Sequence, residues 1–380
     1  MTNNRSPKTN WKLVIGICLV IVSWLLVIPV TASQVLDPTD IGVGARPLGM
    51  GKAYTAIAND GSAIFTNPAG LAQTNSLNVI SMGGNVMSEV PYTVVGGSYP
   101  LLNGTIGIGY VGLGVSGIKE TVLVGSTPEV TGNEGTFANS AINISYAGSM
   151  DNIPYLNKVG TGIFKDTKLG ATVKLVSQGF SSSPSMEGGG GSGFDLDLGA
   201  LCSINEDTTA GLTIKNIIPG NNLKSDELAM GITAGVAKKF AQWNLLTAVD
   251  AEISRSFLLH AGAEWTPIQM IRLRLGLDQK PNAGSSATNV AAGLGVNFKG
   301  FTFDYAYHTF ADLSEFSTHF FSIGYVGEPK KAVSPVLSSP VPAPTIAPAP
   351  VMPAPVVTPA PVTPKPVVKP AQKKPVKKKK

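Results

Sequence analysis

Charged residues recur along the middle of the chain at positions two apart, as in Asp195 and Asp197 or Arg272 and Arg274. Side chains two residues apart lie on the same face of a β-strand. Such a row of charges either lines a path for polar solutes or pairs inside an enclosed interior, and pairing is the more common arrangement. The full set is Lys174, Asp195, Asp197, Lys215, Asp250, Glu252, Glu264, Arg272, Arg274 and Asp304.

Other residues with catalytic potential lack the spacing that catalysis needs. His260, His308 and His319 lie on different segments and do not have the spacing of metal ligands. The glycine run at 188–191 is not followed by the Lys-Ser/Thr of a phosphate-binding loop. A Gly-x-Ser-x-Gly nucleophile motif is absent from the sequence. We therefore expect no enzyme activity, no metal site and no cofactor.

The charges belong to segments in which apolar and polar residues alternate, as in Leu273 and Leu275 opposite Arg272 and Arg274. These segments are about 9–12 residues long, the length that a tilted strand needs to cross a membrane. A soluble β-sandwich shows the same alternation, but only 14% of the residues are charged. The pattern therefore favours an all-β fold, a closed antiparallel transmembrane β-barrel with its polar face toward the lumen. Cys202 lies on an apolar face, so we expect it to face lipid.

About fourteen such segments follow one another, an even count that leaves no unpaired strand edge in lipid. They are expected near 78–87, 91–99, 104–115, 137–148, 167–179, 193–204, 208–217, 229–239, 243–253, 256–265, 269–278, 288–298, 301–308 and 317–326. With a periplasmic N-terminus, the outer connections are predicted to be the long ones, at 116–136, 180–192, 218–228, 279–287 and 309–316. The long segment 149–166 is an exception on the periplasmic side.

The two ends of the chain differ from this body. Residues 1–32 resemble a signal peptide, with Arg5, Lys8 and Lys12 before an apolar run and a cleavage site after Ala32, although an uncleaved anchor is the alternative. All 24 acidic residues lie between Asp37 and Glu328, whereas residues 328–380 are rich in Pro and Ala and end in lysines. We expect this tail to be disordered, to lie in the periplasm and to contact anionic cell wall or an acidic partner. Nucleic acid is not an expected partner.

Residues 33–77 precede the strands and have small residues with helical spacing. They end in Asn67-Pro68-Ala69-Gly70, which is either a gate or, as we favour, a structural turn. In the third strand, glycines are dense enough to weaken pairing, and they indicate a kink with a lateral opening or, more often, close approach of another backbone. These glycines are Gly107, Gly109, Gly112 and Gly114.

Two stretches carry a resemblance to a known family. Residues 48–72, including Asn67, Pro68 and Ala69, resemble the N-terminal segment of FadL-like outer-membrane proteins, and residues 312–325 resemble the closing strand of the branch that includes PorV and PorQ. The resemblance covers about residues 36–327 and implies a 14-stranded barrel with a small helical hatch in its lumen. It also implies a location in the outer membrane of a diderm bacterium.

The resemblance leaves two functions open. A PorV/PorQ-type protein is expected to act as a partner or assembly component of a secretion or envelope complex. A FadL-like transporter is expected to pass hydrophobic small molecules, such as fatty acids or hydrocarbons, across the outer membrane. The closing strand and the basic tail slightly favour the partner function, and outer-membrane lipid surrounds the protein in both cases.

Overall fold

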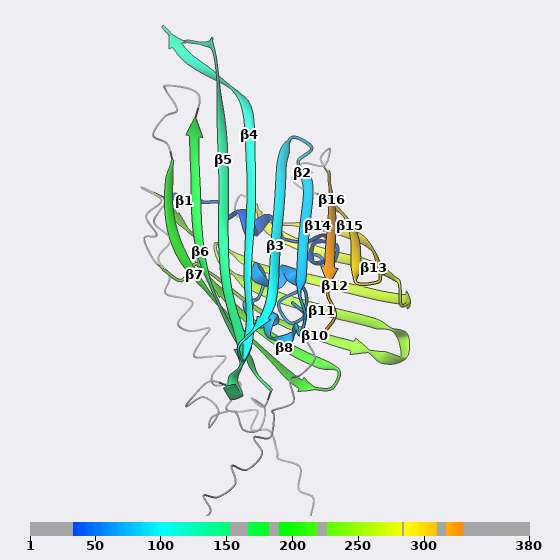
Figure 1. Cartoon of the computed structure of the whole chain (residues 1–380). Helices are drawn as coiled ribbons and strands as arrows, with labels where there is room; N and C mark the ends of the chain where they lie inside the picture. The colour runs from blue at the N-terminus through cyan, green and yellow to red at the C-terminus, as the bar shows by residue number, and fades with distance from the viewer. Residues whose placement is uncertain are drawn as a thin grey trace, which may run out of the picture. The chain divides into compact units, whose positions relative to one another are not determined.

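The computed structural model describes residues 33–152, 166–181, 190–218, 226–282, 285–309 and 317–329. The leader at 1–32, most of the segment at 149–166 and nearly all of the tail at 328–380 lie outside these residues. Among the described residues, 14 antiparallel strands form a closed barrel, in which β16 pairs with β2 and β8 pairs with β10 (Figure 1). The strands are β2 (Asn78–Val86), β3 (Val90–Leu101), β4 (Gly104–Val124), β5 (Thr127–Ser149), β6 (Lys168–Ser181), β7 (Gly191–Asn205), β8 (Thr208–Lys215), β10 (Gly231–Phe240), β11 (Leu245–Ile253), β12 (Phe257–Ile268), β13 (Ile271–Asn282), β14 (Ser285–Phe298), β15 (Phe301–Thr309) and β16 (Ser317–Val326).

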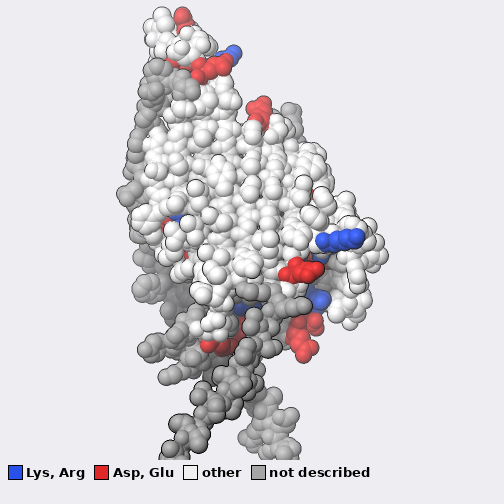
Figure 2. Space-filling view, in the orientation of Figure 1, with Lys and Arg blue, Asp and Glu red and all other residues white. Residues whose placement is uncertain are grey.

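The outer surface of the barrel is apolar because the alternating apolar residues point outward. Leu275 is 67% exposed and Phe321 is 61% exposed. Arg274 and Asp278, at the alternate positions of the strand that carries Leu275, are buried on the inner face. On the face drawn in Figure 2, charged residues are sparse and most lie toward the two ends. A closed sheet with such a surface satisfies its backbone groups without water, so the barrel is built to span lipid. Cys202 is half-buried and shares the outward parity of Phe194 and Leu198, as predicted.

The strands lie where the sequence predicted them, but two predicted long loops are wrong. The connection expected at 116–136 is a β-ribbon, because β4 and β5 stay paired beyond their neighbours up to Val124 and Thr127 (Figure 1). The connection expected at 279–287 is mostly strand, since β13 and β14 pair as far as Asn282 and Ser285. Cross-strand hydrogen bonds thus extend the sheet through residues that do not alternate regularly between apolar and polar.

The lumen holds the hatch (residues 33–77), which consists of short elements. They are β1 (Ser33–Val35), the 3-10 turns η1 (Pro38–Ile41), η2 (Gly61–Ile64) and η3 (Pro68–Gln73), and the helix α2 (Ala45–Gly49); two further turns, η4 (Met150–Asn152) and η7 (Ala241–Trp243), lie in strand connections. β1 pairs in parallel with β9 (Asp226–Leu228), which follows β8. The hatch therefore starts at the barrel end opposite Asn78, and not at the periplasmic end from which the sequence analysis expected it to start.

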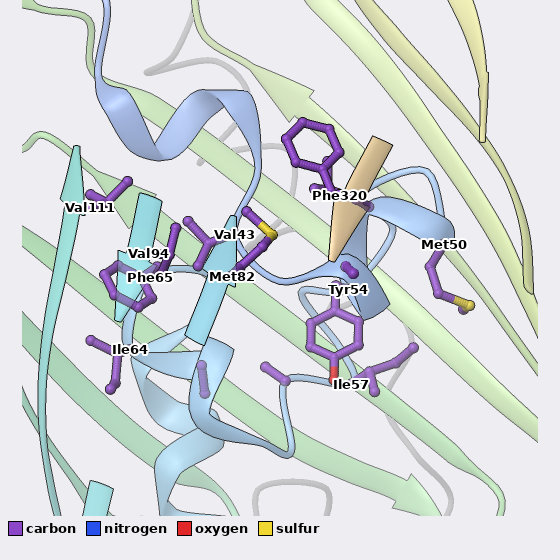
Figure 3. Packing of buried hydrophobic residues seen from close by; sticks show 14 of the residues in the cluster. Val43, Met50, Tyr54, Ile57, Ile64, Phe65, Met82, Val94, Val111 and Phe320 are labelled. Atoms are coloured by element: carbon purple, nitrogen blue, oxygen red, sulfur yellow. The ribbon is translucent and has the colours of Figure 1, made fainter. Parts of the chain in front are cut away.

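The apolar core lies between the hatch and the inner wall. Figure 3 shows Val43, Tyr54, Ile64 and Phe65 of the hatch packed near wall residues such as Val94, and all of these belong to one buried cluster. No helix in the described part of the chain is long and apolar enough to cross a membrane. The hatch is thus a packed element of the fold that occupies the middle of the lumen.

Candidate functional site

Three Asx caps fold the hatch into its short turns. The side chain of Asp37 accepts a hydrogen bond from the Thr39 backbone N, Asp60 accepts one from Ser62 N, and Asn67 accepts one from Ala69 N, at 2.9, 3.0 and 3.1 Å. Each cap satisfies an amide at the start of a 3-10 turn. Pro38 and Pro68 occupy the first positions of their turns, where their fixed φ fits and no N–H is lost.

Asn67, the centre of the predicted motif, is fully buried and uses its amide in three directions. Its Nδ2 donates to Thr55 O at 2.8 Å and to Ala200 O of β7 at 3.2 Å, while its Oδ1 caps η3. A Cβ on Gly70 would collide with the carbonyl of Ala58. Asn67, Pro68, Ala69 and Gly70 therefore form a satisfied structural turn in this conformation, the alternative that the sequence favoured.

Arg46 of α2 joins the hatch to the barrel wall on one side. Its guanidinium donates to both carboxylate oxygens of Glu264 at 2.9 and 3.0 Å, and to Asp60 at 3.2 Å. Glu264 also accepts from Arg274 at 2.7 Å, and Arg274 donates to Asp304 at 2.6 Å. Burial would raise the pKa of Asp60, but the nearby Arg46 guanidinium holds the pKa below its usual value. The ion pairs thus connect the hatch with β12, β13 and β15 of the wall.

A second ion pair holds the start of the hatch. Lys174 is fully buried and its Nζ lies 2.6 Å from Asp37 Oδ2 and 3.1 Å from Asp197 Oδ2. Burial alone would raise the pKa of Asp37, but the Lys174 ammonium holds it well below its usual range. Asp195, on the same face, accepts from the backbone N of Ile218 at 2.9 Å. These charges are therefore engaged within the protein.

Asp250 binds the hatch backbone directly. Its Oδ2 accepts from the backbone N of Tyr54 and of Thr55, at 2.9 and 2.8 Å. Arg272, by contrast, lines a cavity at the Asn78 end of the barrel, and Glu252 lines a second cavity at the opposite end. All ten charged residues of the predicted set, Lys215 included, thus face the interior, and most of them contact the hatch or one another.

The structure brings together a cluster that sequence analysis missed. Asp278 lies 2.9 Å from His260 Nδ1 and 3.0 Å from His308 Nε2, and it also faces Lys52 Nζ of the hatch at 3.4 Å. The second ring nitrogen of His260 lies 3.5 Å from Glu252. The only indication of this cluster in the sequence was that its strand residues occupy the alternate positions that face the lumen. No group of His, Cys, Asp or Glu among the described residues is arranged to hold a metal ion.

Inward-facing glycines receive the other parts of the hatch. A Cβ on Gly107 would lie 2.8 Å from Ile64 Cγ1, one on Gly109 would meet the Phe65 ring, and one on Gly170 would meet the backbone of Pro68. β4 pairs with β3 and β5 without a register shift from Gly104 to Leu113, so no kink opens the wall there. Gly112 and Gly114 are on the outward face, where Tyr110 packs over Gly112. Gly107 and Gly109 therefore mark close approach of the hatch, whereas Gly112 and Gly114 do not.

Two cavities flank the hatch. The vestibule, of about 580 Å³, lies at the end of the barrel opposite Asn78 and has an apolar wall from β2–β5 and a charged wall from β8–β15. Its apolar residues are Leu36, Ile41, Val43, Val86, Met87, Val90, Leu113, Val115 and Phe137, and its charged ones include Asp40, Lys52, Lys215, Glu252 and Asp278. The lower cavity, of about 250 Å³, is lined by Arg46, Asp60, Glu264, Arg272 and Asp304 at the other end.

Comparison with known proteins places this fold among barrel channels. No family model matches the sequence, and neither does any curated protein. Among solved structures, the monoaromatic hydrocarbon channel CymD is 13% identical, with a TM-score of 0.53 over 76% of this chain and 98% of that chain. The toluene transporter TbuX of Ralstonia pickettii is 13% identical, with a TM-score of 0.52 over 76% of this chain and 99% of that chain.

The toluene transporter TodX of Pseudomonas putida gives similar values, with 14% identity and a TM-score of 0.50 over 76% of this chain and 98% of that chain. These structures share the fold of this chain, whereas nothing among them supports the PorV/PorQ branch. They are described as transport proteins and not as enzymes. The chain therefore shares its fold with these proteins and is itself a closed 14-stranded barrel with a hatch in its lumen.

Proposed function

We propose that the protein passes small molecules with an apolar body across the outer membrane, the FadL-like alternative of the sequence analysis. One observation carries this proposal: a vestibule of about 580 Å³ with an apolar wall stands directly on the hatch. Pockets that bind small molecules are commonly of this size and lined mainly by apolar groups. The hydrocarbon and toluene channels with the same fold agree with this substrate class.

The vestibule fits a molecule with one polar end better than a plain hydrocarbon. Val115 and Phe137 lie on its apolar wall, whereas Lys52, Lys215 and Glu252 lie on the other wall. A hydrocarbon would displace the water around these charged side chains without replacing the hydrogen bonds that the water makes to them. This loss makes the free energy of binding less favourable. An amphipathic molecule such as a medium-chain carboxylic acid can satisfy both walls. No contact of the described residues specifically favours the partner function, which stays a prediction.

Uptake by intact cells tests the proposal. The full-length protein is expressed in a diderm host that lacks its own channel for hydrophobic compounds, and uptake of radiolabelled dodecanoate and dodecane is measured. Val115→Asp places a charge on the apolar wall and removes an apolar contact worth about 1–2 kcal/mol, so we expect dodecanoate uptake to fall about tenfold. Ser116→Asp, on the outer face of the same strand, is the matched control and is expected to keep normal uptake.

Three results would contradict the proposal or a part of it. Uptake of neither compound above the level of cells without the protein would exclude the transport function. Equal loss with Val115→Asp and Ser116→Asp would show that the substitution acts through assembly and not through the vestibule. Faster uptake of dodecane than of dodecanoate would overturn the preference for a polar end.

A further inference from the structure

An aromatic band runs along the Asn78 end of the barrel over β10–β16. It consists of two rows of residues that are paired across neighbouring strands, with β13 between the rows (Figure 1). The first row is Phe240, Leu245 and Trp265, and the second row is Phe298, Phe301 and Tyr325. Aromatic side chains at the edge of an apolar barrel surface are typical of the boundary between lipid chains and water.

Each row has a lysine whose ammonium lies over an aromatic ring. Lys238 Nζ lies 5.2 Å from the centre of the Phe240 ring, and this ring stacks on Trp243 at 5.6 Å. Lys299 Nζ lies 5.3 Å from the centre of the Phe298 ring. Both lysines are exposed. A ring attracts an ammonium without neutralising its charge, so each ammonium can still bind an anion.

No carboxylate in the described part of the chain pairs with these two lysines. The connections 241–244, 269–270 and 299–300, which join the strands of the band, contain no acidic residue. Glu206 and Asp207 are exposed in the neighbouring β7–β8 turn, but neither forms an ion pair with Lys238 among the described residues. At the opposite end of the barrel, by contrast, Lys119 lies opposite Glu134 in the register of β4 and β5. The charge of the aromatic band therefore favours an anionic partner from outside the chain.

The positions of the two lysines indicate the class of this partner. Lys238 follows Val236 by two residues, and Val236 is 49% exposed on the outer face, so both side chains lie on that face. Lys299 lies in the turn between Phe298 and Phe301, which are 52% and 49% exposed. An anion that contacts these lysines from the outer face lies at the edge of the lipid, where the phosphates of phospholipids are located. A soluble acidic protein would have to displace lipid from the aromatic rings.

We propose that the Asn78 end of the barrel has two phospholipid sites, each formed by a lysine and the row beside it. The ammonium of Lys238 or Lys299 binds the lipid phosphate, and the row contacts the adjoining part of the acyl chains. The two sites fix the depth at which this side of the barrel lies in the membrane. The inference does not depend on transport, since neither lysine lines a cavity of the lumen.

Lipid binding by the purified full-length protein tests the proposal. Native mass spectrometry from detergent measures the affinity for dioleoylphosphatidylglycerol, and dioleoylglycerol, which has the same chains and no phosphate, is the comparison. Lys238→Gln with Lys299→Gln removes both ammonium groups and keeps long polar side chains. Lys119→Gln, at the opposite end of the barrel, is the matched control. Heat-modifiable migration on a denaturing gel shows whether each variant is folded.

We expect the wild-type chain to bind two molecules of dioleoylphosphatidylglycerol more tightly than dioleoylglycerol. The double variant is expected to bind the phospholipid about fivefold more weakly at each site, and Lys119→Gln to bind it normally. Equal phospholipid affinity in the wild-type chain and the double variant would overturn the inference, and so would equal affinity for the two lipids. Displacement of the phospholipid by millimolar inorganic phosphate would assign the lysines to free phosphate and would also overturn it.

A second measurement locates the aromatic band without changing either lysine. Trp243 and Trp265 are the only tryptophans in residues 33–380, so Trp11→Phe with Trp24→Phe restricts the fluorescence to this end of the barrel. The protein is reconstituted in phosphatidylglycerol vesicles whose acyl chains carry bromine near the carboxyl end or near the methyl end. We expect bromine near the carboxyl end to quench more strongly. Equal quenching, or stronger quenching from the methyl end, would place the band away from the phosphates and contradict the proposal.

Discussion

Two parts of the hatch are fastened to the barrel by different sets of contacts. Residues 45–52 carry Arg46 and Lys52, which pair with Glu264 and Asp278 of the wall, and Met50 and Gly51 also lie against Gly262 and Gly276. Residues 61–73 contain no charged side chain, and they are held by Ile64, Phe65 and Leu71 over inward-facing glycines. Ion pairs can exchange partners one at a time, whereas a close-packed contact is lost as a whole. Residues 45–52 have both kinds of contact and are therefore expected to be the more movable part of the hatch, whereas residues 61–73 are expected to be the fixed part.

The largest effect is expected from crowding the fixed part. Gly170→Val would place a side chain against the backbone of Pro68 and Ala69, which cannot move aside like a flexible side chain. Overpacking costs about 1–3 kcal/mol, and we expect the upper end because the obstacle is backbone. Hydrogen exchange should then rise throughout residues 61–73, and the conductance of the reconstituted barrel should increase.

Gly97→Val is the matched control for this substitution. A Cβ on Gly97 would meet only Asn78 O, at 3.5 Å, so the valine has room. Normal hydrogen exchange in both variants would show that residues 61–73 are not held by close packing. Equal damage in both would mean that valine disturbs the strand itself.

A smaller and more local effect is expected from the movable part. Glu264→Gln removes the carboxylate that Arg46 and Arg274 share, while Asp60 and Asp304 continue to pair with these arginines. Breaking a buried ion pair typically costs about 3–5 kcal/mol, and the remaining partners place this case at the lower end. We expect faster hydrogen exchange for residues 45–52 and unchanged exchange for residues 61–73.

Glu252→Gln provides the comparison for Glu264→Gln. Its side chain is 33% exposed and its partner His260 is 3.5 Å away, so its loss should affect exchange much less. Faster exchange across the entire hatch in Glu264→Gln would contradict the division into two parts.

The sequence predicted the barrel well because strand alternation is local. Fourteen segments, the inward charges and a compact element before them all follow from residues within a few positions of each other. The hatch contacts are long-range and were not predictable in the same way. Arg46 and Glu264 lie 218 residues apart, and only the closed barrel brings them together.

The cluster around Asp278 shows why long-range contacts escape sequence analysis. His260 and Asp278 face each other through the register of β12 and β13, and His308 reaches the same carboxylate from β15. A difference of one residue in either register would turn these side chains outward. The β-ribbon beyond Val115 was missed for a different reason, since its residues do not alternate between apolar and polar.

The smallest effect concerns pH and Asp40, which precedes the movable part and faces the vestibule. Asp40 is exposed to the vestibule, and the surrounding barrel wall, together with the nearby Asp37 and Glu252, raises the pKa of its carboxyl from 3.8 to about 7. Between these two values the folded hatch binds a proton that the unfolded hatch releases, so hatch stability falls as pH rises from about 4 to 7.

Asp40→Asn should remove this slope, because the amide does not titrate and the backbone carbonyl that accepts from Lys52 at 3.0 Å is retained. Protease resistance of residues 33–77, measured across this pH range, reports the slope, and Glu89→Gln in the β2–β3 turn should leave it intact. A slope that persists in Asp40→Asn would assign the proton to another group, and the pH response would then say nothing about the movable part.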